Sequence, residues 1–116
     1  MTQCLDIHVD ESAEAMAQRF IDAWHRAERG EAVKEHHVSF ESWQGLARVL
    51  TPRRLELLHH LRRHAAASIA ELARALGRDY KRVHADVEAL AAAGLIDRTP
   101  TGLRADYGEI RARIAV

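Results

Sequence analysis

Residues 51–106 are divided by helix-start and helix-stop signals into three short helices and a pair of strands, and this order leaves few folds open. Thr51-Pro52 starts the first helix, because Pro is favoured at the first helical position after a capping Thr. Ser68-Ile69-Ala70-Glu71 has the form of a capping box that starts the second helix, and Asp79 can cap the third. Gly77 and Gly94 end the second and third helices.

The apolar residues of these three helices recur at helical spacing, so one side of each helix is predicted to face a core. They are Leu55, Leu58, Leu61 and Ala65 in the first helix, Ile69, Leu72, Ala73 and Leu76 in the second, and Val83, Val87, Leu90 and Ala91 in the third. Residues 95–98 and 103–106 are predicted strands around a turn at 99–102. A short second helix, a compact turn, a longer third helix and a hairpin are typical of a winged helix-turn-helix.

The segment before residue 51 predicts two strands and two helices. Residues 5–9 alternate apolar and polar side chains, as in a half-buried strand. Asp10 can cap a helix over 11–29, and Gly30 ends it. Its apolar residues are Ala13, Met16, Ala17, Phe20, Trp24 and Ala27. Residues 37–40 predict a second strand, and residues 41–50 a helix with Trp43, Leu46, Ala47 and Leu50 on one side.

Residues 110–116 alternate again and predict a last strand. The predicted fold class is therefore α+β, mainly α: a winged helix-turn-helix with an N-terminal strand–helix extension and a C-terminal strand. We expect residues 1–50 to serve dimerisation or partner contact. We expect residues 51–116 to be the DNA-binding part.

The charges are divided between these two parts. Residues 1–50 contain five Lys and Arg against nine Asp and Glu, whereas residues 51–116 contain twelve against eight. A basic half is typical of a chain that binds nucleic acid, and an acidic half indicates a different partner. Arg outnumbers Lys fifteen to two, a bias that a GC-rich genome also produces.

The third helix has an outer side suited to the major groove of DNA. Arg78, Tyr80, Lys81, Arg82, His84, Ala85 and Glu88 fall on this side or its flanks. Arg and Lys near the start of a recognition helix can bind guanine O6 and N7, and a small residue such as Ala85 lets the helix approach the base edges. An ordinary solvated helix face has the same polar character.

The predicted hairpin carries Arg98 and Arg104 on either side of its turn. On a wing, such side chains reach a phosphate or the adjacent minor groove, and on an ordinary hairpin they face solvent. Ser68, at the start of the second helix, is a further candidate for DNA contact.

Three stretches of residues 68–96 resemble winged-helix regulators of the MarR type and their ArsR-like relatives. They are Ser68-Ile69-Ala70-Glu71-Leu72-Ala73-Arg74-Ala75-Leu76-Gly77, Val83-His84-Ala85-Asp86-Val87-Glu88-Ala89-Leu90 and Gly94-Leu95-Ile96.

The wider stretch of residues 40–114 is similar to a group of small archaeal and bacterial DNA-binding, antitoxin-like transcriptional regulators. The shared features are Ser39-Phe40-Glu41-Ser42, Leu50-Thr51-Pro52-Arg53-Arg54, Leu76-Gly77-Arg78-Asp79-Tyr80-Lys81 and Tyr107-Gly108-Glu109-Ile110. The resemblance implies binding to double-stranded DNA as a homodimer. The chain lacks the long C-terminal dimerisation helix of typical MarR proteins, so its dimer must be built differently.

The candidate dimerisation residues lie outside the three-helix part. They are Leu5, Ile7, Val9, Phe20, Trp24, Ile110 and Ile114. The terminal strands pair either with each other or across a dimer axis, since a strand with an unpaired edge needs a partner. The helix over 11–29 packs either on its own chain or on a second chain, and the acidic segment also suits a basic partner such as a toxin.

Other classes of function receive less support. His60 and His64 have the spacing of a zinc-ligand pair, with His36 and His37 as further candidates for a metal-sensing regulator. The chain has no phosphate-binding Gly loop or nucleophile elbow, so we expect no enzyme, no cofactor and no bound metal. Cys4 is the only cysteine of the sequence, so the chain cannot form an internal disulfide. We find no signal peptide and no apolar run of membrane-spanning length, and expect a cytoplasmic protein.

Overall fold

The computed structural model describes residues 4–31 and 36–116, which form an α+β fold around a small parallel sheet. The elements in chain order are β1 (Cys4–Val9), α1 (Ala13–Glu28), β2 (His36–Phe40), α2 (Trp43–Val49), α3 (Pro52–Arg63), α4 (Ile69–Leu76), α5 (Tyr80–Ala92), β3 (Asp97–Thr99), β4 (Gly102–Arg104) and β5 (Glu109–Ile114). No helix in these ranges is both long and apolar enough to cross a membrane.

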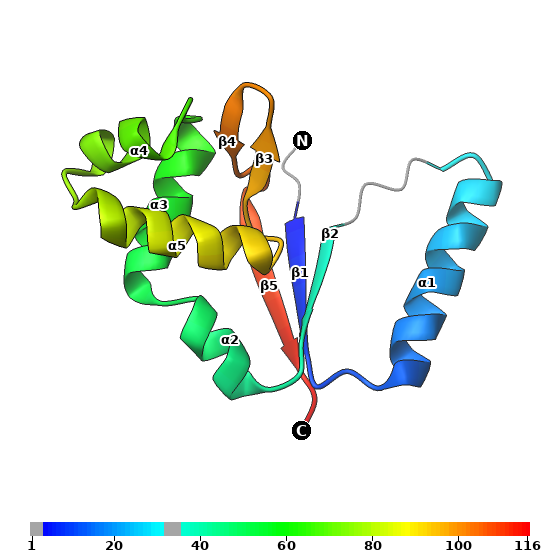
Figure 1. Ribbon diagram of the computed structural model, residues 1–116. Coiled ribbons are helices and arrows are strands. Elements are labelled where there is room, and N and C mark those ends of the chain that lie inside the picture. The colour runs from blue at the N-terminus through cyan, green and yellow to red at the C-terminus, as the bar shows by residue number, and fades with distance from the viewer. Residues whose placement is uncertain (1–3, 32–35) are drawn as a thin grey trace.

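The strands β2, β1 and β5 form a three-stranded sheet in which both pairs are parallel. Leu5, Ile7 and Val9 of the central strand are buried on the side of the sheet that α2, α3 and α5 cover (Figure 1). The helix α1 stands on the opposite side. Of the two arrangements expected for the terminal strands, the structure has the one in which β1 and β5 pair with each other.

The helices in the described ranges all begin at a Ser, Thr or Asp whose side-chain oxygen accepts a hydrogen bond from the backbone three residues later. These N-caps are Ser12, Ser42, Thr51, Ser68 and Asp79. The expected caps at Thr51, Ser68 and Asp79 are confirmed. The expected cap at Asp10 is wrong, because Asp10 has a positive φ of 56° and Ser12 supplies the acceptor for Ala15 instead.

Most of the apolar residues predicted on the inner sides of α2 to α5 are buried or partly buried, but Trp43, Ala47, Leu55 and Ala65 are exposed, and so are all six residues predicted on the inner side of α1. Leu57, Leu58 and Leu61 of α3 are buried, whereas Leu55 is 45% exposed. Trp43 was expected on the inner side of α2, but it is exposed and Leu46 alone of that helix is buried. Trp43 and Leu55 both lie in the first turn of their helix.

The strands β3 and β4 form an antiparallel hairpin that packs against Ala66. The predicted first strand at 95–98 begins later, at Asp97, since Leu95 and Ile96 are buried in the core below the hairpin. Ala66 and Leu103 exchange two backbone hydrogen bonds, of 3.2 and 2.7 Å. The Tyr107 hydroxyl then donates to the Leu95 carbonyl over 2.7 Å and fixes the chain as it enters β5.

Candidate nucleic-acid interface

The outer side of α5 is exposed, as the apolar spacing predicted. Val83, Val87 and Leu90 are fully buried on its inner side. Tyr80, Lys81, Arg82, His84, Ala85 and Glu88 are all exposed. Because the inner side anchors α5 to the core, these six residues keep fixed positions relative to one another.

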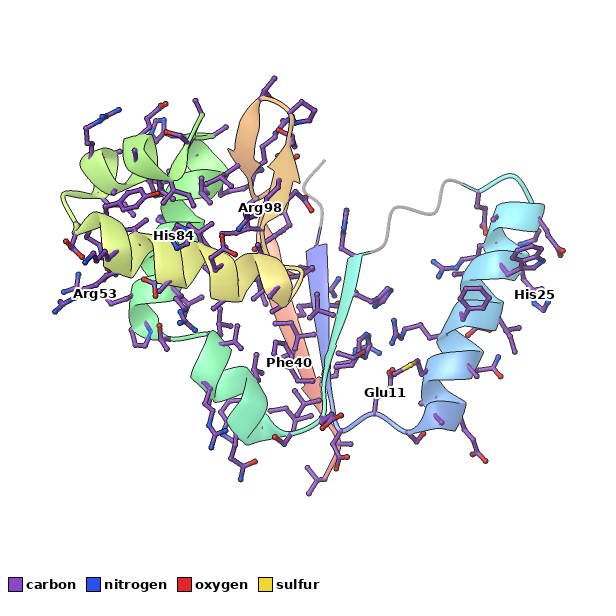
Figure 2. All side chains as sticks on the ribbon, viewed as in Figure 1. Glu11, His25, Phe40, Arg53, His84 and Arg98 are labelled. Carbon is purple, nitrogen blue, oxygen red and sulfur yellow. The ribbon has the colours of Figure 1, made fainter. Side chains whose placement is uncertain are left out.

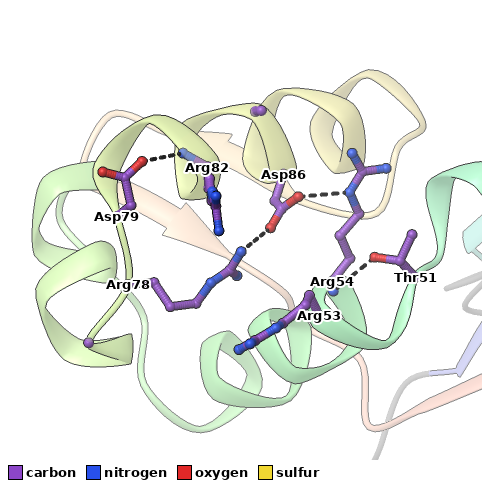
Figure 3. Close-up of a pocket in the computed structure, with 9 residues that line it drawn as sticks. Thr51, Arg53, Arg54, Arg78, Asp79, Arg82 and Asp86 are labelled. Carbon is purple, nitrogen blue, oxygen red and sulfur yellow. Dashed lines mark hydrogen bonds and ion pairs between the residues drawn. The ribbon is translucent and has the colours of Figure 1, made fainter.

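A cavity of about 590 Å³ opens where α5 begins, beside the start of α3 (Figure 3). Four arginines line it: Arg53 and Arg54 from α3, Arg78 from the turn before α5, and Arg82 from α5. Gly77 and Ala85 also line it, and their small size leaves the cavity open. Asp79 and Asp86 also line the hollow, so four guanidinium groups outnumber two carboxylates and leave a net positive surface suited to an anion.

Asp86 holds two of these arginines in place. Its carboxylate accepts from Arg54 Nε over 3.0 Å and from Arg78 Nη2 over 2.8 Å. The three side chains are only 18%, 16% and 14% exposed, in the order Arg54, Arg78, Asp86. Asp86 therefore joins α3, the α4–α5 turn and α5, and it neutralises part of the positive charge of the cavity.

Arg54 also completes the end of α2. Its Nη1 donates to the carbonyls of Arg48 and Val49, each over 3.0 Å. Carbonyls in the last turn of a helix have no partner within the helix, so a guanidinium there satisfies them and favours the local dipole. Arg54 is thus a structural residue of the site.

Arg53 and Arg82 have the most accessible charges in the cavity. Arg53 is 70% exposed at its side chain and lies 3.9 Å from Glu56, a distance at the limit of an ion pair. The guanidinium of Arg82 has no ion pair with any residue that the structure describes, and the same holds for the ammonium group of Lys81 next to it.

The two hairpin arginines are paired within the chain. Arg98 contacts Glu88 of α5, and this hydrogen bond lowers the pKa of the Glu88 carboxyl. Arg104 lies 3.3 Å from Asp106. All four side chains are about half exposed. The predicted DNA-contact residues Glu88 and Arg98 therefore join the hairpin to α5.

The remaining predicted contact residues flank this surface. Ser68 is exposed at the start of α4, where its Oγ accepts from the Glu71 amide over 3.1 Å. The Tyr80 and His84 rings lie 5.9 Å apart on α5. Asp86, Arg53 and Arg54 were not among the site residues predicted from the sequence. The signal for Asp86 was an acidic residue directly before the buried Val87.

The predicted dimerisation residues divide into buried and exposed groups. Leu5, Ile7 and Val9 are buried inside one chain, and Ile110 packs partly against the same core. A second copy cannot reach the buried side chains in this arrangement, because the core of the chain covers them. Phe20, Trp24 and Ile114 are exposed.

The histidine pair considered for metal binding lies on α3 and its end. The His60 and His64 rings are 5.3 Å apart. Within residues 4–31 and 36–116, no set of three His, Cys, Asp or Glu side chains is placed to hold a metal ion.

The comparisons with known proteins point to one family. The family model of HVO_A0114 matches residues 49–112, a segment that contains α3, the cavity, the hairpin and most of β5. The chain belongs to the HVO_A0114 family. No curated protein and no solved structure matches it.

Proposed function

We propose that the protein is a transcriptional regulator that binds double-stranded DNA through a winged helix-turn-helix. In this proposal α4 and α5 form the helix-turn-helix, α5 enters the major groove, and the β3–β4 hairpin is the wing. The order of these elements and the exposed outer side of α5 support the assignment.

The observation that carries the proposal is the four-arginine cavity at the start of α5. A phosphate of the DNA backbone fits a hollow of guanidinium groups next to a helix that enters a groove. Arg53 and Arg78 would bind phosphate oxygens there. Lys81 and Arg82, one turn further into the groove, would reach base edges.

The wing would contact the DNA backbone through Arg98 and Arg104. Each would exchange an exposed carboxylate, Glu88 or Asp106, for a phosphate. Ion pairs between exposed side chains are weak in water, so this exchange costs little. Binding as a homodimer would place two copies of α5 on a palindromic site, and an antitoxin-like role in a small operon is a narrower form of the same proposal.

The experiment is fluorescence anisotropy with DNA from the protein's own promoter and with scrambled DNA, over a salt series. We expect promoter-selective binding that Lys81→Ala/Arg82→Ala weakens by about tenfold or more, because each lost base contact costs about 1–3 kcal/mol. Arg53→Ala should weaken binding to both DNAs and lower the salt slope by about one.

A matched control removes two positive charges from the α1 side of the molecule. Arg29→Ala/Arg113→Ala changes the net charge by the same amount as Lys81→Ala/Arg82→Ala, and both arginines are exposed away from the cavity. It should leave promoter binding within about twofold of the parent protein. An equal loss in both variants would show that only overall charge matters.

A winged-helix module that binds protein is the second candidate. The observation that favours it is the internal pairing of Arg78, Arg98 and Arg104, which reduces the positive charge offered to DNA. A folded protein that binds neither DNA at low salt would support this function and overturn the first.

A further inference from the structure

The helix α1 carries an apolar stripe that nothing else in the described chain covers. The stripe consists of Met16, Phe20, Ile21 and Trp24, which are 44%, 70%, 44% and 59% exposed. No residue of α1 is buried, although the helix has sixteen residues. A helix with one apolar side ordinarily turns that side to a core.

The polar side of α1 faces the sheet instead. Gln18, Asp22 and Arg26 of α1 line a cavity of about 440 Å³ together with His8, His37 and Arg113 of the sheet. At 100° per residue, Phe20 and Trp24 project from the opposite side of the helix. Figure 2 shows α1 standing apart from the sheet, with side chains on both of its sides.

A partly buried set of hydrogen bonds fixes this orientation. Arg19 Nη2 lies 2.6 Å from Glu11 Oε1, and Glu11 Oε2 lies 2.9 Å from His8 Nδ1. His8, only 4% exposed, is bonded through Nε2 to His37 Nδ1 over 2.9 Å. These contacts join the start of α1 to β1 and β2, so the helix cannot rotate without breaking them.

The sheet of the same chain offers no place for the stripe. Its α1-facing side carries Asp6 and His8 of β1, with Arg111 and Arg113 beside them on β5. Turning α1 over would press Phe20 and Trp24 onto these groups and remove charged side chains from water. Burying charges without new partners is costly, so the chain cannot cover its own stripe.

We propose that a second copy of the chain covers the stripe, with α1 packed against α1 of the partner. This inference rests on the proposed function in one respect: a regulator that binds the two halves of a palindromic DNA site does so as a twofold-symmetric dimer. The four side chains expose roughly 450 Å² per copy, a patch of the size that marks an interaction site. Two copies bury about 900 Å² of this surface, and the neighbouring polar side chains bring the total to about 1,200 Å², the lower end for a specific interface.

The charges that border the stripe favour a parallel pair. Glu14 and Glu28 lie along one border, whereas Arg26 lies on the sheet-facing side of α1 and the Arg19 guanidinium is held by Glu11. A twofold axis parallel to the helices keeps the two glutamate borders apart. An antiparallel pair would bring like borders together.

The test is sedimentation of the full chain without DNA, so that its result does not depend on the proposed function. We expect the parent protein to sediment as a dimer at about 10 µM. Phe20→Glu and Trp24→Glu should each raise the dissociation constant about 100-fold or more, because a central aromatic side chain dominates such interfaces. Both residues are exposed, and circular dichroism should show unchanged helix content.

Ala15→Glu is the matched control, because it adds the same charge to α1 but on the side that faces the sheet. It should sediment as the parent does. A parent protein that stays monomeric at 100 µM would overturn the proposal, and so would a dimer that survives both Phe20→Glu and Trp24→Glu.

Cross-linking tests the direction of the pair. In a Cys4→Ser background, Ala13→Cys and Ala27→Cys mark the two ends of α1. A parallel pair forms a disulfide in each variant alone. Cross-links that form only when the two variants are mixed would overturn the parallel arrangement.

Discussion

At the residue scale, Asp86 controls both the stability of the site and the charge of its cavity. Its carboxylate is the shared partner of Arg54 and Arg78, and all three side chains are largely removed from solvent. Removing the acceptor leaves two partly buried guanidinium groups without the carboxylate that they share. Asp86 is therefore a positioning residue, since it fixes Arg78, the one of its two partners proposed to bind a DNA phosphate.

We expect Asp86→Ala to lower the free energy of unfolding by about 2 kcal/mol, because a partly buried ion pair that loses one member leaves the other uncompensated. Urea unfolding monitored by circular dichroism measures the change. Asp97→Ala, an exposed acidic residue at the start of β3, is the control and should change stability by no more than about 0.5 kcal/mol. Equal effects in the two variants would contradict the role of Asp86.

His8 makes stability depend on pH near neutrality. Burial lowers its pKa below 6.5, and Arg19 and His37 lower it further, against the opposing effects of Glu11 and Asp6. The unfolded chain therefore binds a proton at a pH where the folded chain does not. This contribution to stability is present above pH 6.5 and is lost as the pH falls from 6.5 through the lower pKa of folded His8.

Urea unfolding between pH 5 and pH 8 should show this loss in the parent protein, and His8→Gln should reduce it. His25→Gln, at an exposed position of α1, should leave the pH dependence of the parent unchanged. The lowered pKa of Glu11, held down mainly by Arg19, affects stability only at the acid end of this range and below it, as the pH approaches 4.5. A flat profile in the parent protein would contradict the assignment.

At the element scale, the hairpin depends on Gly102. Its φ is +138°, and a Cβ placed there would lie 2.1 Å from the Ala66 carbonyl oxygen. That oxygen accepts the 2.7 Å hydrogen bond from Leu103, so it cannot move away without loosening the hairpin. Any side chain at this position therefore separates β4 from the helical part of the chain.

Gly102→Ala should lower the free energy of unfolding by about 3 kcal/mol or more, through backbone strain and the clash together. Thermal unfolding monitored by circular dichroism measures it. Gly77→Ala is the control, because Gly77 also has a positive φ, of +65°, but a Cβ there meets nothing within 4 Å. It should cost only about 1–2 kcal/mol. A milder effect at Gly102 than at Gly77 would contradict this account.

The elements could be predicted largely because their ends are determined locally. Thr51, Ser68 and Asp79 cap helices wherever those helices pack, so the sequence alone locates them. Which side of a helix is buried depends on what packs against it, and this is where Leu55 and Trp43 were misplaced. The sequence left open whether the α1 stripe faces its own chain or a second one, since its outward direction follows from hydrogen bonds between residues on three elements.

The same distinction applies to the candidate site. The exposed side of α5 follows from its apolar spacing, so Lys81, Arg82 and Ala85 could be selected from the sequence. The ion pairs of Arg78 and Arg98 could not, because Asp86 and Glu88 become their partners only when the turn and hairpin fold onto α5.

At the scale of the whole molecule, the three-stranded sheet joins the N-terminal segment to the part proposed to bind DNA. A division at residue 50 separates β1 and β2 from β5, yet β1 is hydrogen-bonded to both neighbours. Leu5, Ile7 and Val9 also lie in the same core as Leu57, Val87 and Leu90. The described chain should therefore unfold as one cooperative unit.

Ile7→Ala should destabilise the whole chain by about 2–4 kcal/mol, as expected for a fully buried side chain. Tryptophan fluorescence reports on α1 and α2, where Trp24 and Trp43 lie, whereas circular dichroism reports on all the helices. The two probes should give coincident urea transitions if the chain unfolds as one unit. Ile21→Ala, on the exposed stripe of α1, should cost less than about 1 kcal/mol at concentrations below dimerisation. Separate transitions for the two probes would contradict a single unit.

The central position of β1 has a consequence for how the chain folds as it is made. Cys4 and Glu109 are register partners, although 105 residues separate them along the chain. At a ribosomal rate of about 5–20 residues per second, β5 emerges roughly 5–20 s after β1. Throughout that interval one edge of β1 lacks its strand, and the apolar residues beneath it lack part of their cover. Completion of the sheet is therefore a late step, one that follows the translation of nearly all of this sequence.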